Sequence, residues 1–123
     1  MVVSNTAQLT ATFDILAHSH RRYVLYHLTS NSGAVGIRTL ATGIVEWNMR
    51  HSGGNRAIST NAVESALYHH HLPKLADAGF VTFDRDAASV ALQKSDRLDK
   101  FLPDAAVIDG VTHLLLTTGV AKN

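Results

Sequence analysis

The chain has 123 residues, a formal net charge of +1 and no cysteine, which is the size of one domain around a single hydrophobic core. The lack of cysteine excludes disulfides, thiolate metal sites and cysteine nucleophiles. No apolar run approaches the roughly 18 residues that a membrane-spanning helix needs. The first residues also have no basic segment followed by an apolar block, as a secretory signal would. We therefore expect a cytoplasmic protein.

Positive charge is concentrated in the first part of the chain. Residues 1–76 contain six Lys or Arg against three Asp or Glu, whereas residues 77–123 contain five against seven. Seven of the eight histidines also precede residue 77. If the fold gathers these residues on one face, that face is basic and suits a nucleic-acid partner, and the alternative is a mixed, solvated surface.

Apolar residues at helical spacing predict a first helix over residues 9–17. Leu9, Phe13 and Leu16 form its apolar stripe and are expected to pack on the core. Thr6 precedes this segment and is available as its N-terminal cap.

A second helix is predicted to follow Ser19, which is placed to cap it, with a buried stripe formed by Val24, Leu25 and Leu28. Arg21 and Arg22 fall in its first turn, where a cation opposes the helix dipole. This unfavourable placement has an explanation if the pair meets a DNA phosphate or a carboxylate such as Asp14. The alternative is that both side chains are simply exposed to solvent.

A third helix is predicted over residues 35–49, with Trp47 closing the core at its end. The polar, Gly-rich segment that follows, residues 50–59, is predicted to be a loop, and either Ser59 or Thr60 caps the next helix. Arg56 lies in this loop and could reach a DNA phosphate.

The next helix is predicted from about Thr60 to Ala78, where Gly79 ends it. Pro73 implies a kink or a junction between two helical pieces, because proline removes a backbone hydrogen bond inside a helix. One side carries Leu67, Leu72 and Leu75, which we expect in the core. The other side carries polar residues that can donate to phosphates or base edges: Asn61, Ser65, His69, His70 and Lys74.

A β-hairpin is predicted over residues 80–92, with an Asp-rich tip at residues 84–88 whose carboxylates would repel DNA phosphate. We expect a further helix to begin at Pro103, with an apolar face formed by Val107, Ile108, Val111, Leu114 and Leu115. Residues 1–93 would thus form the main domain. Residues 94–123 would form a helical extension of the same compact unit, packed on its own domain or on a second subunit.

Two stretches resemble one known family. Residues 68–81, Tyr-His-His-His-Leu-Pro-Lys-Leu-Ala-Asp-Ala-Gly-Phe-Val, look like the end of the recognition helix and the start of the wing in winged helix-turn-helix regulators of the ArsR type. More narrowly, they resemble the small winged-helix domains common in halophilic archaea. Residues 16–28 are similar to the Leu-Ala-x-x-x-Arg-Arg-x-Ile-Leu-x-x-Leu pattern of the second helix in that class.

This resemblance covers roughly residues 9–92. It implies a mainly α fold with a β-hairpin wing, an α+β winged helix-turn-helix to which a C-terminal helix is added. The chain departs from the class at residues 50–59, since the class joins its two helices by a tight turn and this loop is longer.

The resemblance also implies a DNA-binding transcription regulator that binds double-stranded DNA. A homodimer through the C-terminal helix is expected, because the related regulators pair through terminal helices. In this reading the helix from Thr60 enters the major groove, and Arg21, Arg22 and Arg56 contact the backbone. The competing interpretation is a winged helix used for protein contact. A third, a ligand- or metal-sensing repressor, lacks the cysteines that many metal sensors of the class use.

The run His69-His70-His71 does not by itself predict a metal site. Consecutive helix residues point about 100° apart and cannot surround one ion together. A metal site would need His70 together with His27, His51 or a residue of a second subunit. We therefore expect no metal or other cofactor. We expect a structural role for His71. The chain has no nucleophile elbow, phosphate loop, zinc-protease helix or dinucleotide turn, and we do not expect an enzyme.

Overall fold

The computed structural model describes residues 2–51 and 58–111, with side chains from residue 6 onward. The described part is mainly helical with a small antiparallel sheet, an α+β fold. In chain order its elements are α1 (Val2–Leu16), α2 (Ser19–Thr29), β1 (Val35–Gly36), α3 (Ile37–His51), α4 (Thr60–Ala66), the π-helical segment η1 (Leu67–His71), α5 (Leu72–Asp77), β2 (Val81–Asp84), β3 (Ser89–Leu92) and α6 (Asp96–Asp109). None of the described helices is long and apolar enough to cross a membrane.

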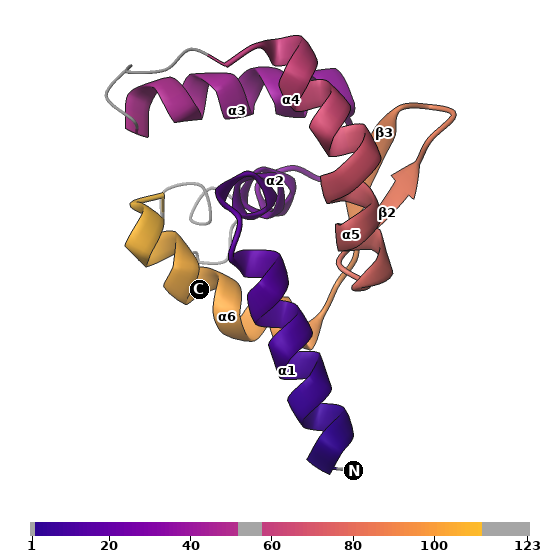
Figure 1. Ribbon diagram of the computed structural model, residues 1–123, viewed down its shortest axis with the longest axis vertical. Helices are drawn as coiled ribbons and strands as arrows, with labels where there is room; N and C mark the ends of the chain where they lie inside the picture. Colours follow the sequence, from indigo (N-terminus) through magenta and orange to yellow (C-terminus); the bar gives the residue numbers. More distant parts are fainter. Residues whose placement is uncertain (1, 52–57, 112–123) are drawn as a thin grey trace.

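Helix α2 lies at the centre of the molecule (Figure 1). In this view α3 lies above α2, α1 and α6 lie below it, and α5 and the hairpin strands β2 and β3 lie beside it (Figure 1). The expected stripe of α2, Val24, Leu25 and Leu28, is buried at 1% exposure or less, and Tyr26 is also fully buried. Burial on so much of its surface makes α2 the element around which the core forms.

The sheet has three strands in the order β1-β3-β2, all antiparallel. The predicted hairpin is confirmed, since Val81 pairs with Leu92 and Thr82 with Ala91. Strand β1 occupies the start of the segment that we expected to be the third helix. Its two residues pair with Val90 and Ser89, and a strand this short is too brief to show an alternating pattern in the sequence.

Helix α1 differs from its prediction in extent and in the face that it buries. It begins at Val2, so Thr6 lies within it rather than capping it. Leu9 and Phe13 are 42% and 52% exposed, whereas Thr12 and Ile15 are buried. The N-terminal part of α1 extends beyond the rest of the molecule (Figure 1). Phe13 lies next to the buried Thr12 but off the buried stripe, with its ring centroid 5.2 Å from that of Phe101 in α6.

The helix predicted from about residue 60 to 78 is confirmed as three consecutive helical pieces, and Ser59 caps the first of them. Its break lies at the predicted proline. The N–H of Leu72 bonds to the carbonyl of Leu67, five residues earlier, in the π-helical segment just before Pro73. The inner residues Leu67, Leu72 and Leu75 are fully buried, as expected. Gly79 follows with φ of +85°, a conformation that favours glycine.

The last described helix does not begin at Pro103. Helix α6 begins at Asp96, capped by the side chain of Ser95, and Pro103 lies inside it. Its inner face has a four-residue spacing, formed by Leu98, Leu102 and Ala106. Two residues of the expected apolar face, Val107 and Ile108, are instead 65% and 85% exposed because they lie off this stripe. Val111 is buried as expected, and Leu114 and Leu115 lie outside the described residues.

Candidate nucleic-acid interface

The bent helix formed by α4, η1 and α5 presents one polar face to solvent. Ser65, His69, His70 and Lys74 are exposed on it, as predicted, together with Asn61, while Thr60 is half-buried. The opposite side is anchored in the core by Val63, Leu67, His71, Leu72 and Leu75. A helix held in this way by an apolar face can present its polar side chains to a partner without unfolding.

Arg38, in the first turn of α3, joins this face although sequence reasoning did not assign it a role. Its Nη1 donates to Oδ1 of Asn61 at 2.7 Å and to Oε1 of Glu64 at 2.7 Å, and its side chain is 60% exposed. These contacts place the first turns of α4 beside the first turn of α3. A tight turn would place the start of α4 next to the end of α3. With the longer connection, the start of α4 lies next to the start of α3 instead.

Arg21 is not available on the surface, contrary to the predicted phosphate contact. It is 9% exposed, and its guanidinium donates to the carbonyl of Ile15 at 3.0 Å and to the carbonyl of Asp14 at 2.9 Å. A third bond, at 3.2 Å, runs from Nη1 to Nδ1 of His71. Arg21 therefore ties α1 to η1 within the fold.

Arg22 is likewise engaged within the fold. It forms two bonds to Asp109, from Nε to Oδ2 at 2.7 Å and from Nη2 to Oδ1 at 3.1 Å, and Tyr26 also donates to this carboxylate. The hydrogen bond to Asp109 raises the pKa of Arg22. Burial would raise the pKa of Asp109, but the bonds from Arg22 and Tyr26 outweigh it and lower that pKa. The prediction that Arg22 contacts the DNA backbone therefore conflicts with its position.

The carbonyl acceptors explain why two cations are tolerated in the first turn of α2. Arg22 also donates to the carbonyl of Leu16 at 2.7 Å, so the two arginines bind three of the last four carbonyls of α1. These carbonyls are the partly negative, unsatisfied end of a helix, where a cation is stabilising. The favourable interaction with the end of α1 offsets the unfavourable one with the start of α2.

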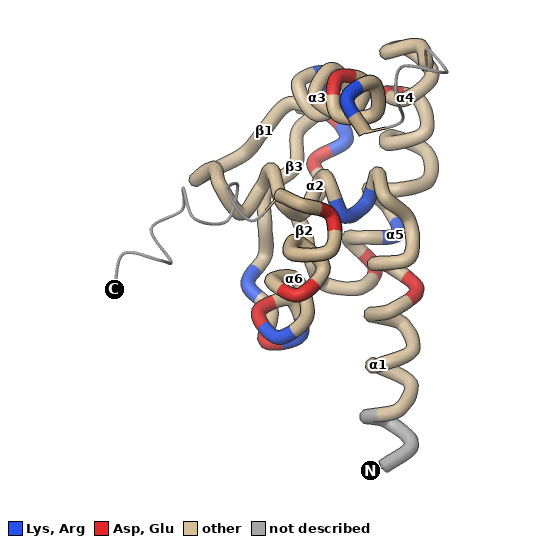
Figure 2. The backbone as a smooth tube through the Cα atoms, turned by 90° about the vertical axis from the view of Figure 1, so that its left-hand side faces the viewer, with Lys and Arg blue, Asp and Glu red and all other residues tan. Residues whose placement is uncertain are grey.

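The remaining cations do not form a uniformly basic face. Lys or Arg occurs together with Asp or Glu in α3, α5 and α6 (Figure 2). Lys74 lies 3.2 Å from Oδ2 of Asp14, and Arg38 is paired with Glu64 as described above. Arg56 lies outside the described residues. The described surface is therefore mixed in charge rather than basic.

The hairpin tip is held by its own side chains. Oδ1 of Asp84 accepts a hydrogen bond from the N–H of Ala87 at 3.0 Å, which stabilises the turn. The guanidinium of Arg85 lies over the rings of Tyr68 and Phe83, at 5.2 and 5.1 Å from their centroids. The one cation of this turn is thus stacked against η1 and β2.

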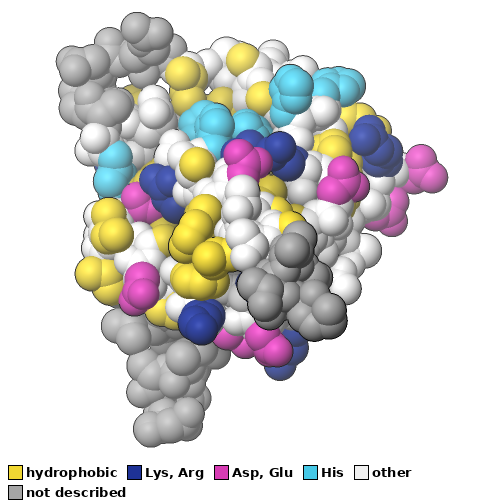
Figure 3. Space-filling model, turned by 60° about the horizontal axis from the view of Figure 1, so that its bottom comes forward, with side chains coloured by type: hydrophobic (Ala, Val, Ile, Leu, Met, Phe, Trp, Pro, Cys, Tyr) yellow, Lys and Arg dark blue, Asp and Glu magenta, His cyan; other side chains and the backbone are white. Residues whose placement is uncertain are grey.

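Three histidines meet near the start of α2, and sequence reasoning did not bring them together. His18, His20 and His71 each have one ring nitrogen that lies within 4.8 Å of the corresponding nitrogens of the other two. Burial lowers the pKa of His71 to about 4, with contributions from His18 and Arg21, and burial also lowers the pKa of His20. On the face that Figure 3 shows, several histidine side chains lie next to Lys or Arg.

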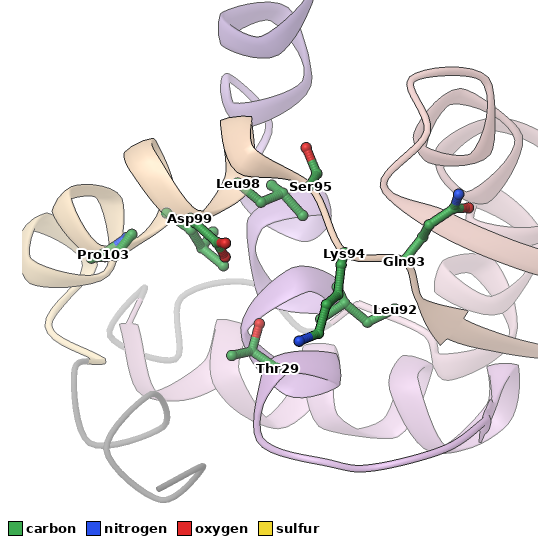
Figure 4. Close-up of a pocket in the computed structure, with 9 residues that line it drawn as sticks. Thr29, Leu92, Gln93, Lys94, Ser95, Leu98, Asp99 and Pro103 are labelled. Atoms are coloured by element: carbon green, nitrogen blue, oxygen red, sulfur yellow. The ribbon is translucent and has the colours of Figure 1, made fainter. Parts of the chain in front are cut away.

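A separate hollow lies between the end of α2, the β3–α6 connection and α6 (Figure 4). Its volume is about 410 Å³, and Leu92, Leu98 and Leu102 are among the residues that line it. Lys94 and Asp99 also line it. None of the described residues predicted to contact DNA borders this hollow, so it is distinct from the face of α4, η1 and α5.

Comparison with known proteins connects the chain to one family. The family described as "Domain of unknown function (DUF7344)" matches residues 13–91, from the end of α1 to β3. No curated protein and no solved structure matches the chain significantly.

Proposed function

We propose that this chain, which belongs to the DUF7344 family, is a DNA-binding transcription regulator that acts through a winged helix-turn-helix. The observation that carries the proposal is the exposed polar face of α4, η1 and α5, supported from behind by α2 and α3. The order of elements also supports it. A winged helix consists of a helix, a short strand, two helices and a two-stranded hairpin. The chain has these parts in this order, and β3, the second strand of its hairpin, pairs with the short strand β1.

In this proposal the polar face enters the major groove. Ser65 and Asn61 near the start of the helix can bond base edges, and His69, His70 and Lys74 lie further along. Thr60, at the first position of α4, would lie near a phosphate, because a helix N-terminus attracts anions. Arg38 would hold Asn61 in position and add a phosphate contact, taking over the role first expected of Arg21 and Arg22.

The hairpin would contribute little to DNA affinity. Its exposed Asp84 and Asp86 repel phosphate, and Arg85 is stacked on two rings. The polar face of the helix would therefore carry most of the binding.

A homodimer would present two such helices to a two-fold symmetric DNA site. Its support is apolar surface on α1 and α6, the first and last described helices. Leu9 and Phe13 of α1 and Val107 and Ile108 of α6 are 42–85% exposed. A second subunit that covers these side chains would remove their apolar surface from water, which favours association.

Fluorescence anisotropy of a labelled duplex, titrated with protein at several salt concentrations, tests the proposal. The informative variant is Arg38→Gln/Lys74→Gln, because both side chains are exposed and their replacement leaves the core intact. If each loses one phosphate contact, the slope of log affinity against log salt becomes shallower by roughly 2. Lys94→Gln/Lys100→Gln is the control, since it removes the same charge from exposed positions around α6.

Equal binding by the two variants would contradict a DNA contact at the polar face. No detectable binding at low salt by the unmodified protein would favour the second candidate, a winged helix used for protein contact. The pairing of Arg38 with Glu64 and of Lys74 with Asp14 favours that candidate, because it leaves less unbalanced positive charge on the face. An apolar protein interface would weaken little with salt.

A further inference from the structure

Three imidazoles from distant parts of the sequence converge at one place in the fold. His18 precedes α2, His20 lies in its first turn, and His71 ends the π-helical segment η1. The rings of His18 and His71 are 4.4 Å apart between centroids, and one nitrogen from each of the three residues lies within 4.8 Å of the others. His71 is buried, His20 is half-buried and His18 is exposed, so the cluster is open to solvent on one side.

We infer that His18, His20 and His71 form a binding site for a divalent transition-metal ion, with Zn²⁺ as the ion that fits best. Three imidazole ligands leave a fourth tetrahedral position for water or another ligand. The cluster contains no carboxylate, which argues against Mg²⁺ and Ca²⁺ because these ions prefer oxygen. The site does not depend on whether the chain binds DNA.

The geometry requires only a modest adjustment. Zinc–nitrogen bonds of about 2.0–2.1 Å in a tetrahedral site place the ligand nitrogens about 3.3 Å apart. The present separations of up to 4.8 Å therefore have to shorten by roughly 1.5 Å at most. His18 and His20 can supply this by rotation of their side chains, since both reach solvent, while His71 is held by the core.

The hydrogen bonds of the cluster show what an ion would displace. Arg21 can only donate, so Nδ1 of His71 must be the acceptor of their 3.2 Å bond. Nδ1 of His18 likewise accepts from the N–H of His20 at 3.1 Å. Both neutral rings then carry their proton on Nε2, and an ion must either take the Nδ1 lone pairs or bind Nε2 after the proton moves.

An ion on either route displaces one of these bonds, and each donor residue either keeps other bonds or lies close to solvent. Arg21 keeps its bonds to the carbonyls of Ile15 and Asp14 if it releases His71. The N–H of His20 lies in the first turn of α2, close to solvent. Burial lowers the pKa of His18, His20 and His71, which favours the neutral imidazole, the form that binds metal.

Isothermal titration of Zn²⁺ into the full chain, carried on a tag without histidine, tests the site. The variant is His18→Asn/His20→Gln, in which asparagine retains the ability to cap α2 while the imidazole ligands are lost. The control is His69→Asn/His70→Gln, which removes two exposed histidines adjacent to His71 in sequence but outside the cluster. Circular dichroism establishes that both variants are folded.

We expect one Zn²⁺ per chain, with affinity lowered about tenfold or more in His18→Asn/His20→Gln and little changed in the control. Thermal unfolding should follow the same order, because an ion that binds only the folded state raises the midpoint. Binding that is equal in His18→Asn/His20→Gln and the unmodified protein would overturn the inference. So would a loss confined to the control variant, one ion per two chains, or no binding by the unmodified protein at concentrations up to about 1 mM.

Discussion

Replacing Arg21 by alanine should destabilise the fold strongly. The substitution removes three hydrogen bonds from one buried guanidinium, two of them to carbonyls at the end of α1 and one to His71. A hydrogen bond to a charged group contributes about 1.5–3 kcal/mol, and part of this is offset because the buried charge no longer has to be desolvated. We expect the free energy of unfolding to fall by about 3 kcal/mol.

The exposed cation Lys74 provides the contrast. Its ion pair with Asp14 spans 3.2 Å, and its side chain is 47% exposed, so Lys74→Ala should change the free energy of unfolding by less than about 1 kcal/mol. Urea unfolding followed by the fluorescence of the single, buried Trp47 measures both variants. With a typical slope of roughly 1.5 kcal/mol per molar urea, Arg21→Ala should lower the midpoint by about 2 M.

A loss below about 1 kcal/mol for Arg21→Ala would refute the argument that its bonds within the fold determine its role. The same unfolding measurement is needed to interpret a DNA-binding experiment on this variant. If Arg21→Ala is strongly destabilised, weaker DNA binding by this variant reports unfolded protein rather than a lost phosphate contact. For this reason Arg38 and Lys74 are the better positions at which to remove positive charge.

Two further predictions concern α6. Asp109→Asn leaves Arg22 without its carboxylate and should lower the free energy of unfolding by about 2–3 kcal/mol at pH 7, measured by urea unfolding. Because the pKa of Asp109 is lowered in the folded state, its contribution is present above the ordinary pKa of aspartate and is lost as pH falls through the folded value. The difference between the two proteins should therefore shrink below about pH 4, and a constant difference would argue against the carboxylate as its source. Ile108→Ser, at a side chain that is 85% exposed, should leave stability within about 0.5 kcal/mol but weaken self-association in analytical ultracentrifugation, and an unchanged association constant would remove α6 from the dimer interface.

Local patterns in the sequence determined most of the secondary structure. The buried stripe of Leu67, Leu72 and Leu75 and the left-handed Gly79 depend on neighbours within a few residues, and both predictions are confirmed. The cap is Ser59, one of the two residues that the sequence offers for it. Pro73 likewise marked the break in the helix, because a missing N–H acts locally.

The same reasoning failed where burial depended on distant elements. Leu9 and Phe13 have helical spacing, but α1 packs on the core through a neighbouring face that carries Thr12 and Ile15. The sequence predicts a helix start at Pro103, whereas Leu98 and Leu102 extend the buried face on its N-terminal side and α6 begins at Asp96. Periodicity identifies an amphipathic helix, but it does not tell how far the core extends along it.

The candidate sites divide in the same way. The exposure of Ser65, His69 and His70 followed from the position of the buried stripe on their own helix. The partners of Arg21 and Arg22 could not be read in this way, because their carbonyl acceptors belong to the end of another helix and Asp109 is 87 residues from Arg22. The histidine cluster also exists only because the turn before α2 packs against the bend at η1. Local spacing places a side chain on a face of its own helix, and only the packing of helices decides what that face meets.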